Sequence, residues 1–236
     1  MTAGPSPTAE YGWDAGDEQG WIATALSAPV TTPLVRIWPY QHPAVVLGRG
    51  QRAPAGAAQR AADLRVALVV RQTGGGAVLA GPWLLGAAVI LPPQHPFVRP
   101  GISESFRWLG NAHAEWLQGL ELRARCVLPA EVRLDRSMAW ACFASASHWE
   151  VEANGRKIVG LSQARKRNGV LFSSAVLVSP CVWPLLCEIL GESSESAAAL
   201  AQRTAPCAEL LGRALSAAAL APSLLETLHA ALARAA

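Results

Sequence analysis

Apolar runs bounded by turn-forming residues divide the first half of the chain into short strands. Four such runs are Leu34–Trp38, Ala44–Leu47, Arg65–Val70 and Trp83–Leu91. Their Val, Ile, Leu and Ala residues suit buried strands. A turn at Pro39–Pro43 separates the first two runs, and Pro92-Pro93 ends the last one, because proline lacks the N–H that a strand ladder needs. The pattern therefore predicts a buried sheet.

A second set of strands is predicted where two Asn-Gly pairs interrupt residues 147–178. Asn154-Gly155 and Asn168-Gly169 are each flanked by strand-forming residues. Asn-Gly favours the two-residue type I′ turn, in which both residues need positive φ. We expect a three-stranded antiparallel meander over about 147–153, 156–164 and 170–178.

Strict alternation along the middle strand of this meander separates its side chains into two sets. Lys157, Val159 and Leu161 fall on one face, and Ile158, Gly160 and Ser162 fall on the other. Taken by itself, Lys157 beside a hairpin turn is most simply a solvated surface residue, because few lysines are buried.

Helical patterns fill most of the remaining chain. Helices are expected over Asp14–Ala28, part of Gln51–Leu64 and Ser103–Leu120, and one more strand is expected at Val127–Leu134. Beyond Pro180 the chain is rich in alanine, and Pro184, Pro206 and Pro222 stand where a first helical turn accepts proline. The predicted fold class is α+β, a mostly antiparallel β-sheet with packed helices. A helical C-terminal extension over residues 181–236 is expected to pack on the domain formed by residues 1–180.

Composition and charge narrow the class of protein. The 236 residues are 51% hydrophobic and 16% charged, as in a globular protein with one core. A net charge of +3 does not favour a nucleic-acid partner. No apolar run is long enough to span a membrane and the first residues lack a signal pattern, so no membrane partner and a cytoplasmic location are expected. The five cysteines contain no Cys-x-x-Cys, so neither a disulfide framework nor a metal site is expected.

The stretch Arg71–Val78, which reads RQTGGGAV, lies between two of the predicted strands. Three consecutive glycines lose much backbone entropy on folding, so we expect them where the chain turns sharply or approaches another group closely. Their N–H groups can cradle a carboxylate or phosphate, and Arg71 adds a planar cation. The alternative is a mobile hairpin loop with an incidental arginine, since glycine-rich loops are weak signals by themselves.

Three further motifs accompany this stretch. They are Leu47–Gln51 (LGRGQ), Cys142-Phe143 ahead of a Trp-Glu-Val strand, and Gly155–Arg165 (GRKIVGLSQAR). Together the four motifs resemble the lipoate–protein ligase and octanoyltransferase branch of the biotin/lipoyl protein ligase superfamily, and they occur in family order. The resemblance covers roughly residues 20–180 and implies a biotin/lipoyl protein ligase-like catalytic domain over residues 1–180.

The resemblance also implies roles for individual residues. Lys157 would contact the acyl carboxylate or carbonyl group, where a cation stabilises developing negative charge in a dry pocket. Cys142 is the only cysteine near a family motif and is the candidate nucleophile; the alternative is a small buried strand residue. The implied substrate-binding residues are Arg71, Gly74, Gly75, Gly76, Ala77, Val78, Gly160, Ser162 and Gln163.

The chain departs from the family pattern after two of these motifs. The family usually has a His-Asp pair and then Gly-Asn after its glycines, where this chain has Leu79–Trp83. A His-Gly pair after the second hairpin is replaced by Leu171–Ala175. Ligases of the family use those polar groups to bind nucleotide and metal, so the use of ATP and Mg²⁺ is left open.

Three functions fit these residues. The first, which the overall similarity favours, is a lipoate–protein ligase: lipoate and ATP give a lipoyl-adenylate, which a lysine of a lipoyl-domain acceptor protein attacks. The second is an octanoyltransferase that takes its acyl group from an acyl carrier protein through Cys142 and passes it to the acceptor lysine. The third is a non-catalytic protein that binds an acyl cofactor or a carrier.

Overall fold

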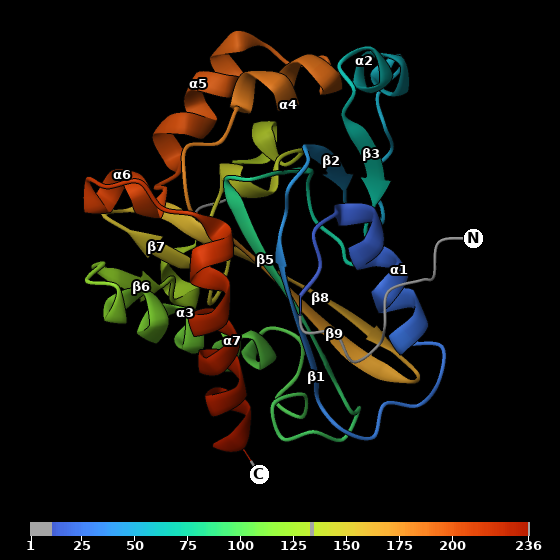
Figure 1. Cartoon of the computed structure of the whole chain (residues 1–236), viewed down its shortest axis with the longest axis vertical. Helices are drawn as coiled ribbons and strands as arrows, with labels where there is room; N and C mark the ends of the chain where they lie inside the picture. The colour runs from blue at the N-terminus through green and yellow to red at the C-terminus, as the bar shows by residue number, and fades with distance from the viewer. Residues whose placement is uncertain (1–10, 133–134, 236) are drawn as a thin grey trace.

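A six-stranded sheet forms the centre of the computed structural model, which describes residues 11–132 and 135–235 (Figure 1). Its strands run in the order β1-β5-β9-β8-β7-β6. Their bounds are β1 Leu34–Pro39, β5 Leu84–Leu91, β6 Ala124–Cys126, β7 Val151–Ala153, β8 Arg156–Lys166 and β9 Gly169–Leu177. Every neighbouring pair is antiparallel, so the predicted, mostly antiparallel α+β fold is confirmed.

A smaller sheet holds the glycine stretch. Its strands are β2 (Ala44–Leu47), β3 (Ala67–Val70) and β4 (Val78–Ala80), and β2 lies in the middle, parallel to β3 and antiparallel to β4. The residues between β3 and β4 therefore cross the end of β2 rather than join two paired strands. The interpretation of the glycines as a hairpin loop is wrong for this reason.

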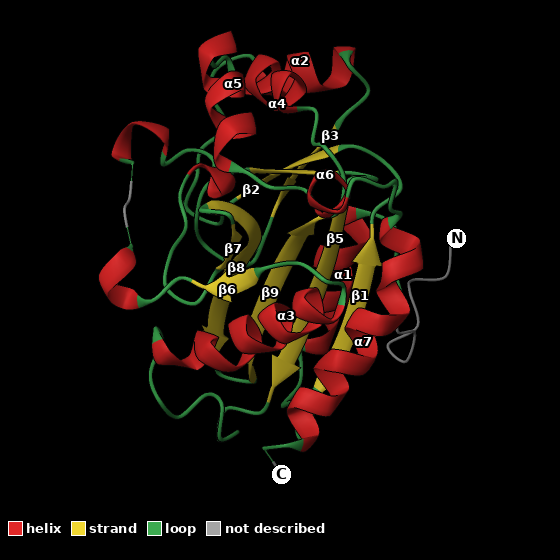
Figure 2. Ribbon diagram, turned by 90° about the vertical axis from the view of Figure 1, so that its left-hand side faces the viewer, coloured by secondary structure: helices red, strands yellow, loops and turns green. Residues whose placement is uncertain are grey.

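Helices cover both faces of the large sheet. One face packs against α3 (Arg107–Gly119) and α7 (Ala217–Ala233), as Figure 2 shows. The other packs against α1 (Ala15–Ala25), the small sheet and α4 (Trp183–Leu190). The remaining helices are α2 Ala57–Asp63, α5 Ser194–Arg203, α6 Cys207–Leu211 and the 3₁₀ turns η1 Glu104–Phe106, η2 Pro129–Glu131, η3 Arg136–Met138 and η4 Cys142–Ala144. Among the helices that the structure describes, none is both long and apolar enough to cross a membrane.

Two expectations about single elements are wrong. No strand forms over residues 127–132: β6 ends at Cys126 and a 3₁₀ turn follows, while residues 133–134 of that prediction lie outside the described chain. Pro222 is the sixth residue of α7 rather than a first-turn residue. Both errors arise because local patterns were read without the tertiary packing that decides where an element begins and ends.

The two Asn-Gly turns differ from each other. Asn154 and Gly155 have φ values of 53° and 71°, as the type I′ turn requires. In the second hairpin Lys166 pairs with Gly169, so the turn residues are Arg167 and Asn168, and neither has positive φ. The Asn168 side chain donates to the Leu26 carbonyl at 2.9 Å, and the Asn168 carbonyl accepts from the Val30 amide at 2.7 Å. Contacts with the chain after α1 therefore shape the second turn.

Strand β8 contains an irregularity that changes which side chains share a face. Its register with β7 shifts between Val151, which pairs with Val159, and Glu152, which pairs with Lys157. One extra residue on β8 is the signature of a β-bulge, which re-aims neighbouring side chains. The Lys157 Cε consequently lies 3.5 Å from the position of a Cβ on Gly160. The predicted strict alternation, which put Lys157 and Gly160 on opposite faces, is wrong here.

Candidate active site

The glycine stretch lies against two other loops. A Cβ at Gly48 would collide with the Gly75 carbonyl, and a Cβ at Gly76 would lie 2.7 Å from the carbonyls of Ala139 and Trp140. The Arg49 amide donates to the Thr73 carbonyl at 2.8 Å. Glycine is therefore needed at Gly76, and at Gly48 opposite Gly75, because the backbone of another segment lies too close for a side chain. Close backbone approach is one of the two reasons expected from the sequence.

Arg71 closes this loop. Its Nε and Nη2 atoms both donate to the Gly74 carbonyl, at 3.2 and 2.6 Å. The residue is 8% exposed. In this state the guanidinium stabilises the conformation of the glycine stretch while its charge stays at the edge of the site.

The backbone of Cys142 is held by Ala77, the residue between the glycines and β4. The Ala77 amide donates to the Trp140 carbonyl at 2.6 Å, and the Cys142 amide donates to the Ala77 carbonyl at 2.9 Å. These bonds join two segments that are far apart in the sequence. They place the half-buried Cys142 at the start of η4, beside the glycine stretch.

Lys157 is buried, and its interpretation as a solvated surface lysine is wrong. Its side chain is 3% exposed. Its Nζ donates to the carbonyls of Cys142 and Ser145, at 2.7 and 2.9 Å, and pairs with Glu150 Oε2 at 2.7 Å. The amine also lies 5.2 Å from the centre of the Phe143 ring, a distance at which a cation is attracted to the ring face.

Glu150 is a residue of this cluster that the sequence analysis missed. It is 3% exposed, and it accepts hydrogen bonds from the Ser147 amide at 2.6 Å and the Leu161 amide at 2.9 Å. Glu150 lies directly before β7, between Trp149 and Val151; an acidic residue between two large apolar ones was the available signal, because buried carboxylates need partners.

Two cavities meet at Cys142. A pocket of about 240 Å³, here called the polar pocket because Arg71, Glu150 and Lys157 bring charges to its wall, is also lined by Gly74–Gly76 and Cys142, although most of its surface is apolar. A narrower, mostly apolar cavity of about 50 Å³ runs between the two sheets and is also lined by Cys142. Arg71 and Leu161 are shared by both as well. Cys142 therefore belongs to the wall that the apolar cavity shares with the pocket bearing the charged residues.

The Cys142 thiol and the Lys157 side chain both lie beside Gly160. The Cys142 Sγ and the Lys157 Cε lie 3.7 and 3.5 Å from the position that a Cβ on Gly160 would take. A larger side chain at this position would occupy the space between the two groups. The bulge in β8 thus brings together residues that alternation had separated.

The apolar cavity has a polar group in its wall. Glu18 of α1 accepts a hydrogen bond from the Tyr40 hydroxyl at 2.8 Å, and both residues line the cavity. Burial raises the pKa of Glu18 to about 7, although the Tyr40 hydrogen bond and the Arg71 charge oppose the shift. Burial also raises the pKa of Tyr40. Sequence analysis missed this pair because Glu18 reads as an ordinary first-turn acid.

The remaining predicted site residues divide between the cavity and other places. Val78 and Ser162 line the apolar cavity, and Ser162 Oγ is hydrogen-bonded to Thr73 Oγ1 at 2.9 Å. Gln163 instead donates to Ser105 Oγ at 2.8 Å, on the side of the sheet that carries η1. Within residues 11–132 and 135–235, no group of three or more His, Cys, Asp or Glu side chains is placed to hold a metal ion.

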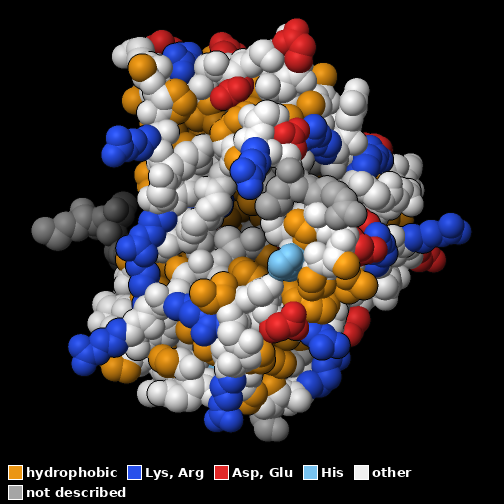
Figure 3. All heavy atoms as spheres, turned by 180° about the vertical axis from the view of Figure 1, so that it is seen from behind, with side chains coloured by type: hydrophobic (Ala, Val, Ile, Leu, Met, Phe, Trp, Pro, Cys, Tyr) orange, Lys and Arg blue, Asp and Glu red, His pale blue; other side chains and the backbone are white. Residues whose placement is uncertain are grey.

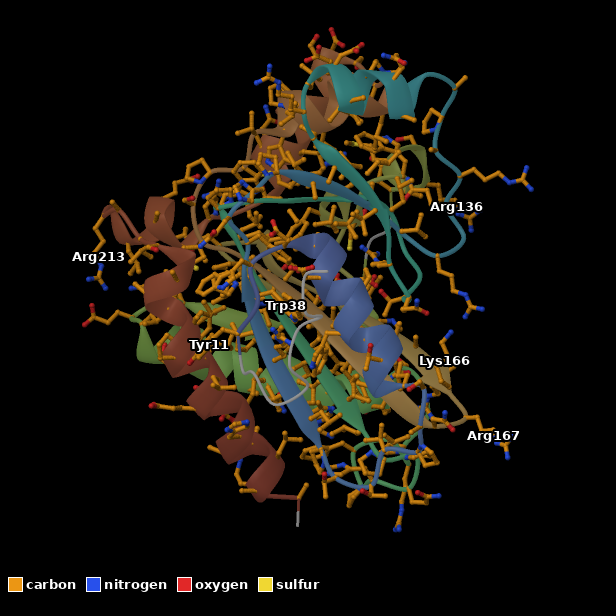
Figure 4. The ribbon with its side chains drawn as sticks, turned by 45° about the vertical axis from the view of Figure 1, so that its right-hand side comes forward. Tyr11, Trp38, Arg136, Lys166, Arg167 and Arg213 are labelled. Atoms are coloured by element: carbon orange, nitrogen blue, oxygen red, sulfur yellow. The ribbon has the colours of Figure 1, made fainter. Side chains whose placement is uncertain are left out.

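The basic hairpin tip lies apart from this cluster. Arg165 is tied to the fold, since it donates to the Val98 carbonyl at 3.1 Å and to Ser105 Oγ at 3.2 Å. Lys166 and Arg167 project outward from the end of β8 and β9 (Figure 4). On the face seen in Figure 3, Lys and Arg side chains are interspersed with Asp and Glu around a central hollow. That face therefore carries both signs of charge.

Comparisons with known proteins place the chain in one protein family. Residues 17–229 match the family model of the lipoyl protein ligase A/B catalytic domain. Two similar proteins are octanoyltransferases LipM, from Kyrpidia tusciae (30% identical, covering 66% of this chain and 58% of that protein) and from an Exiguobacterium species (31%, 67% and 59%). The chain thus spans less than two thirds of the length of these relatives. A putative lipoate protein ligase from T. acidophilum with bound lipoic acid has a similar fold, with a TM-score of 0.67 at 19% identity, over 93% of this chain and 83% of that one.

Proposed function

Because this chain belongs to the lipoyl protein ligase A/B catalytic domain family, we propose that it transfers a medium-length acyl group from a carrier-protein thioester, through Cys142, to a lysine of an acceptor domain. An octanoyl group is the proposed cargo, since the similar curated proteins are octanoyltransferases. A lipoyl group is the alternative cargo. The proposed acceptor is a lipoyl domain.

One observation carries the proposal: the Cys142 thiol stands at the junction of the apolar cavity and the polar pocket, beside Lys157. An acyl chain has an apolar tail and a polar carbonyl end, and this junction offers a compartment for each. At about 50 Å³ the apolar cavity is smaller than the roughly 300 Å³ of small ligand sites, so its walls must move apart to admit an eight-carbon chain.

The proposed reaction has two exchanges. First, the Cys142 sulfur attacks the thioester carbonyl, its new C–S bond forms, the bond to the carrier sulfur breaks, and the carrier thiol takes up the proton that Cys142 lost. Second, the acceptor amine attacks the Cys142 thioester, the amide bond forms, and the amine proton returns to the Cys142 sulfur. In both steps the Lys157 cation stabilises negative charge that develops on the carbonyl oxygen.

This geometry favours the thioester route over the ATP-dependent route that overall similarity had favoured. An adenylate already activates the carboxylate and needs no thiol, whereas a thioester exchange needs a sulfur where the acyl carbonyl lies. Two of the polar elements that ligases of the family use for nucleotide and metal are replaced here by Leu79–Trp83 and Leu171–Ala175. No step of the proposed reaction passes through ATP or Mg²⁺.

The C-terminal helices belong to the same proposed catalytic unit. The Ala205 amide donates to the Lys157 carbonyl at 2.9 Å. Arg203 of α5 donates to the Ala144 carbonyl at 3.2 Å and pairs with Asp135 at 2.8 Å. The extension over 181–236 therefore supports both the strand that bears Lys157 and the turn that bears Cys142.

The test is to incubate the protein with octanoyl carrier protein and to weigh the intact protein by mass spectrometry. We expect an octanoyl adduct that maps to Cys142 and is released by hydroxylamine, followed by transfer to an apo lipoyl domain. Cys142→Ser should abolish the adduct and lower transfer by a factor on the order of 10³ or more, because an alcohol is a far poorer nucleophile near neutral pH.

Cys126→Ser is the matched control, since Cys126 is also half-buried but lies by α3, away from the two cavities. It should form the adduct at the wild-type rate. Lipoylation that requires lipoate and ATP and survives Cys142→Ser would replace this proposal with the ligase. Binding of the carrier without transfer would favour the non-catalytic protein.

A further inference from the structure

We propose that Glu150 is a positioning residue that keeps Lys157 in its ammonium form and directs it toward Cys142. The catalytic part of this inference rests on the proposed function. The part that concerns the ion pair stands on the structure of the pair alone, and the two parts are tested separately below.

The hydrogen bonds of Glu150 identify it as a carboxylate. Oε1 accepts from the Leu161 amide at 2.9 Å, and Oε2 accepts from the Ser147 amide at 2.6 Å and from Lys157 Nζ at 2.7 Å. Every one of these partners is a donor. A protonated acid would turn an O–H toward donors, so the ionised form fits this set of bonds and the neutral form does not.

The number of acceptors around Lys157 Nζ likewise identifies the group as an ammonium. Three acceptors surround Nζ: the Glu150 carboxylate and the carbonyls of Cys142 and Ser145. A neutral amine has two hydrogens and would leave one acceptor without a donor, whereas the ammonium has three. In this arrangement Lys157 is therefore a cation that donates three hydrogen bonds and has no lone pair with which to act as a general base.

Burial makes the pairing consequential. The Lys157 and Glu150 side chains are 3% and 4% exposed, so water solvates each partner far less than it would at the surface. A buried cation that loses its anion is forced toward the neutral form. The other charged groups in the walls of the pockets that adjoin Lys157 are Arg71, Arg125, Glu131, Asp135, Arg136, Glu152 and Arg203. Of the described carboxylates, only Glu150 forms an ion pair with the amine.

A strained turn aims Glu150 inward. Trp149 has φ of 65°, a region that bulky residues enter only when their surroundings enforce it. The Trp149 amide donates to the Val127 carbonyl at 2.9 Å, and the Val127 amide donates to the Glu150 carbonyl at 2.8 Å. Arg107 lies 5.4 Å from the centre of the Trp149 ring, and a Cβ at Gly110 would collide with the Trp149 carbonyl. Packing against α3 thus sets the direction of the Glu150 side chain.

The two lysines of the chain allow a direct test of the ion pair. Lys157 and Lys166 are its only lysines, and Lys166 at the hairpin tip serves as an internal reference. Trace acetylation with acetic anhydride modifies only the unprotonated amine, and mass spectrometry gives the ratio of labelled Lys157 to labelled Lys166. In Glu150→Gln we expect this ratio to rise on the order of 10-fold or more, because the buried cation has lost its anion.

Glu152→Gln is the matched control. Glu152 is the register partner of Lys157 on β7, but its carboxylate forms an ion pair with Arg125 and not with the Lys157 amine, so the labelling ratio should stay at the wild-type value. If Glu150→Gln does not fold, Glu150→Asp keeps the charge but is too short for the present contact, and we expect a smaller rise in the ratio. A ratio that equals the wild-type value in the folded Glu150 variant would overturn the inference, whether or not the protein transfers acyl groups.

A double-mutant cycle tests the link to activity. Glu150→Gln should lower kcat for octanoyl transfer by a factor on the order of 10 to 10² while KM for the carrier protein changes little, since the positioned cation acts in the transition state. In a Lys157→Gln background the same change should have almost no further effect. Equal losses in both backgrounds would mean that Glu150 only supports the fold, and this would overturn the positioning role. A raised labelling ratio in a protein that forms no Cys142 adduct would refute the proposed function and leave the ion pair standing.

Discussion

Two buried glutamates line the two cavities that share Cys142, and their hydrogen-bond partners differ. Glu150 is bound by an ammonium group and two backbone amides. Glu18 is bound by the neutral Tyr40 hydroxyl, and burial raises its pKa to about 7. Burial is similar for both, at 3% and 6% exposure. Two carboxyl groups at similar depth thus have different partners: an ammonium group and backbone amides for Glu150, and a neutral hydroxyl for Glu18.

The same contrast separates the two compartments of the site. The pocket around Lys157 contains the Lys157–Glu150 ion pair, whereas in the apolar cavity Glu18 is hydrogen-bonded to the Tyr40 hydroxyl and Arg71 lies in the wall. Trp38 lies beside α1 (Figure 4). The guanidinium carbon of Arg36 lies 4.7 Å from the centre of the Trp38 ring. The proposed acyl transfer would need a charged pocket next to an apolar cavity, because it joins charge development at the carbonyl group to an apolar hydrocarbon chain.

The largest expected effect comes from removing the cation of the pair. Lys157→Ala should lower acyl transfer on the order of 10²-fold or more. Because the change leaves Glu150 buried and unpaired, it should also lower the free energy of unfolding by about 3–5 kcal/mol. Steady-state transfer assays and urea unfolding measure the two effects. A solvated lysine could be removed with little change in stability, so a variant of wild-type stability would contradict the buried ion pair.

A smaller, pH-dependent effect is expected at Glu18. Its pKa is raised from 4.5 to about 7 in the folded protein, so between these values the unfolded chain has released a proton that the folded chain still holds. Stability from this group is therefore complete below about pH 4.5, decreases as pH rises to about 7, and then levels off. The loss is on the order of 3 kcal/mol. Urea unfolding of wild type and Glu18→Gln across this range measures it, and a constant difference between the two proteins would rule it out.

The smallest expected effect concerns Ser174 in the apolar cavity. Its buried hydroxyl has no hydrogen-bond partner within the part of the chain that the structure describes, and it lines the cavity. Removing a buried hydroxyl that lacks a partner relieves a desolvation penalty, so Ser174→Ala should raise the free energy of unfolding by about 1 kcal/mol. Chemical denaturation is the measurement. A clear loss of stability would show that the hydroxyl has a partner in solution.

Several features of this protein follow from the amino-acid sequence alone. The apolar runs predict β1, β2, β3 and β5, and Asn154-Gly155 predicts the β7–β8 turn with its two positive φ angles. These features depend on local steric preferences, which act over a few residues and are therefore visible in the sequence. The four motifs likewise sufficed to indicate the family, to which the match over residues 17–229 assigns the chain.

The arrangement of the site was decided only by the tertiary structure. The bulge in β8 places Lys157 on the same side as Gly160. Ala77 binds the backbone of Cys142 through hydrogen bonds. Packing of Trp149 against α3 directs Glu150 toward the interior. Each of these depends on contacts between segments far apart in the chain. Such contacts can override strand alternation and place a charge in the interior, because the free energy of burial and pairing exceeds the preferences of single residues.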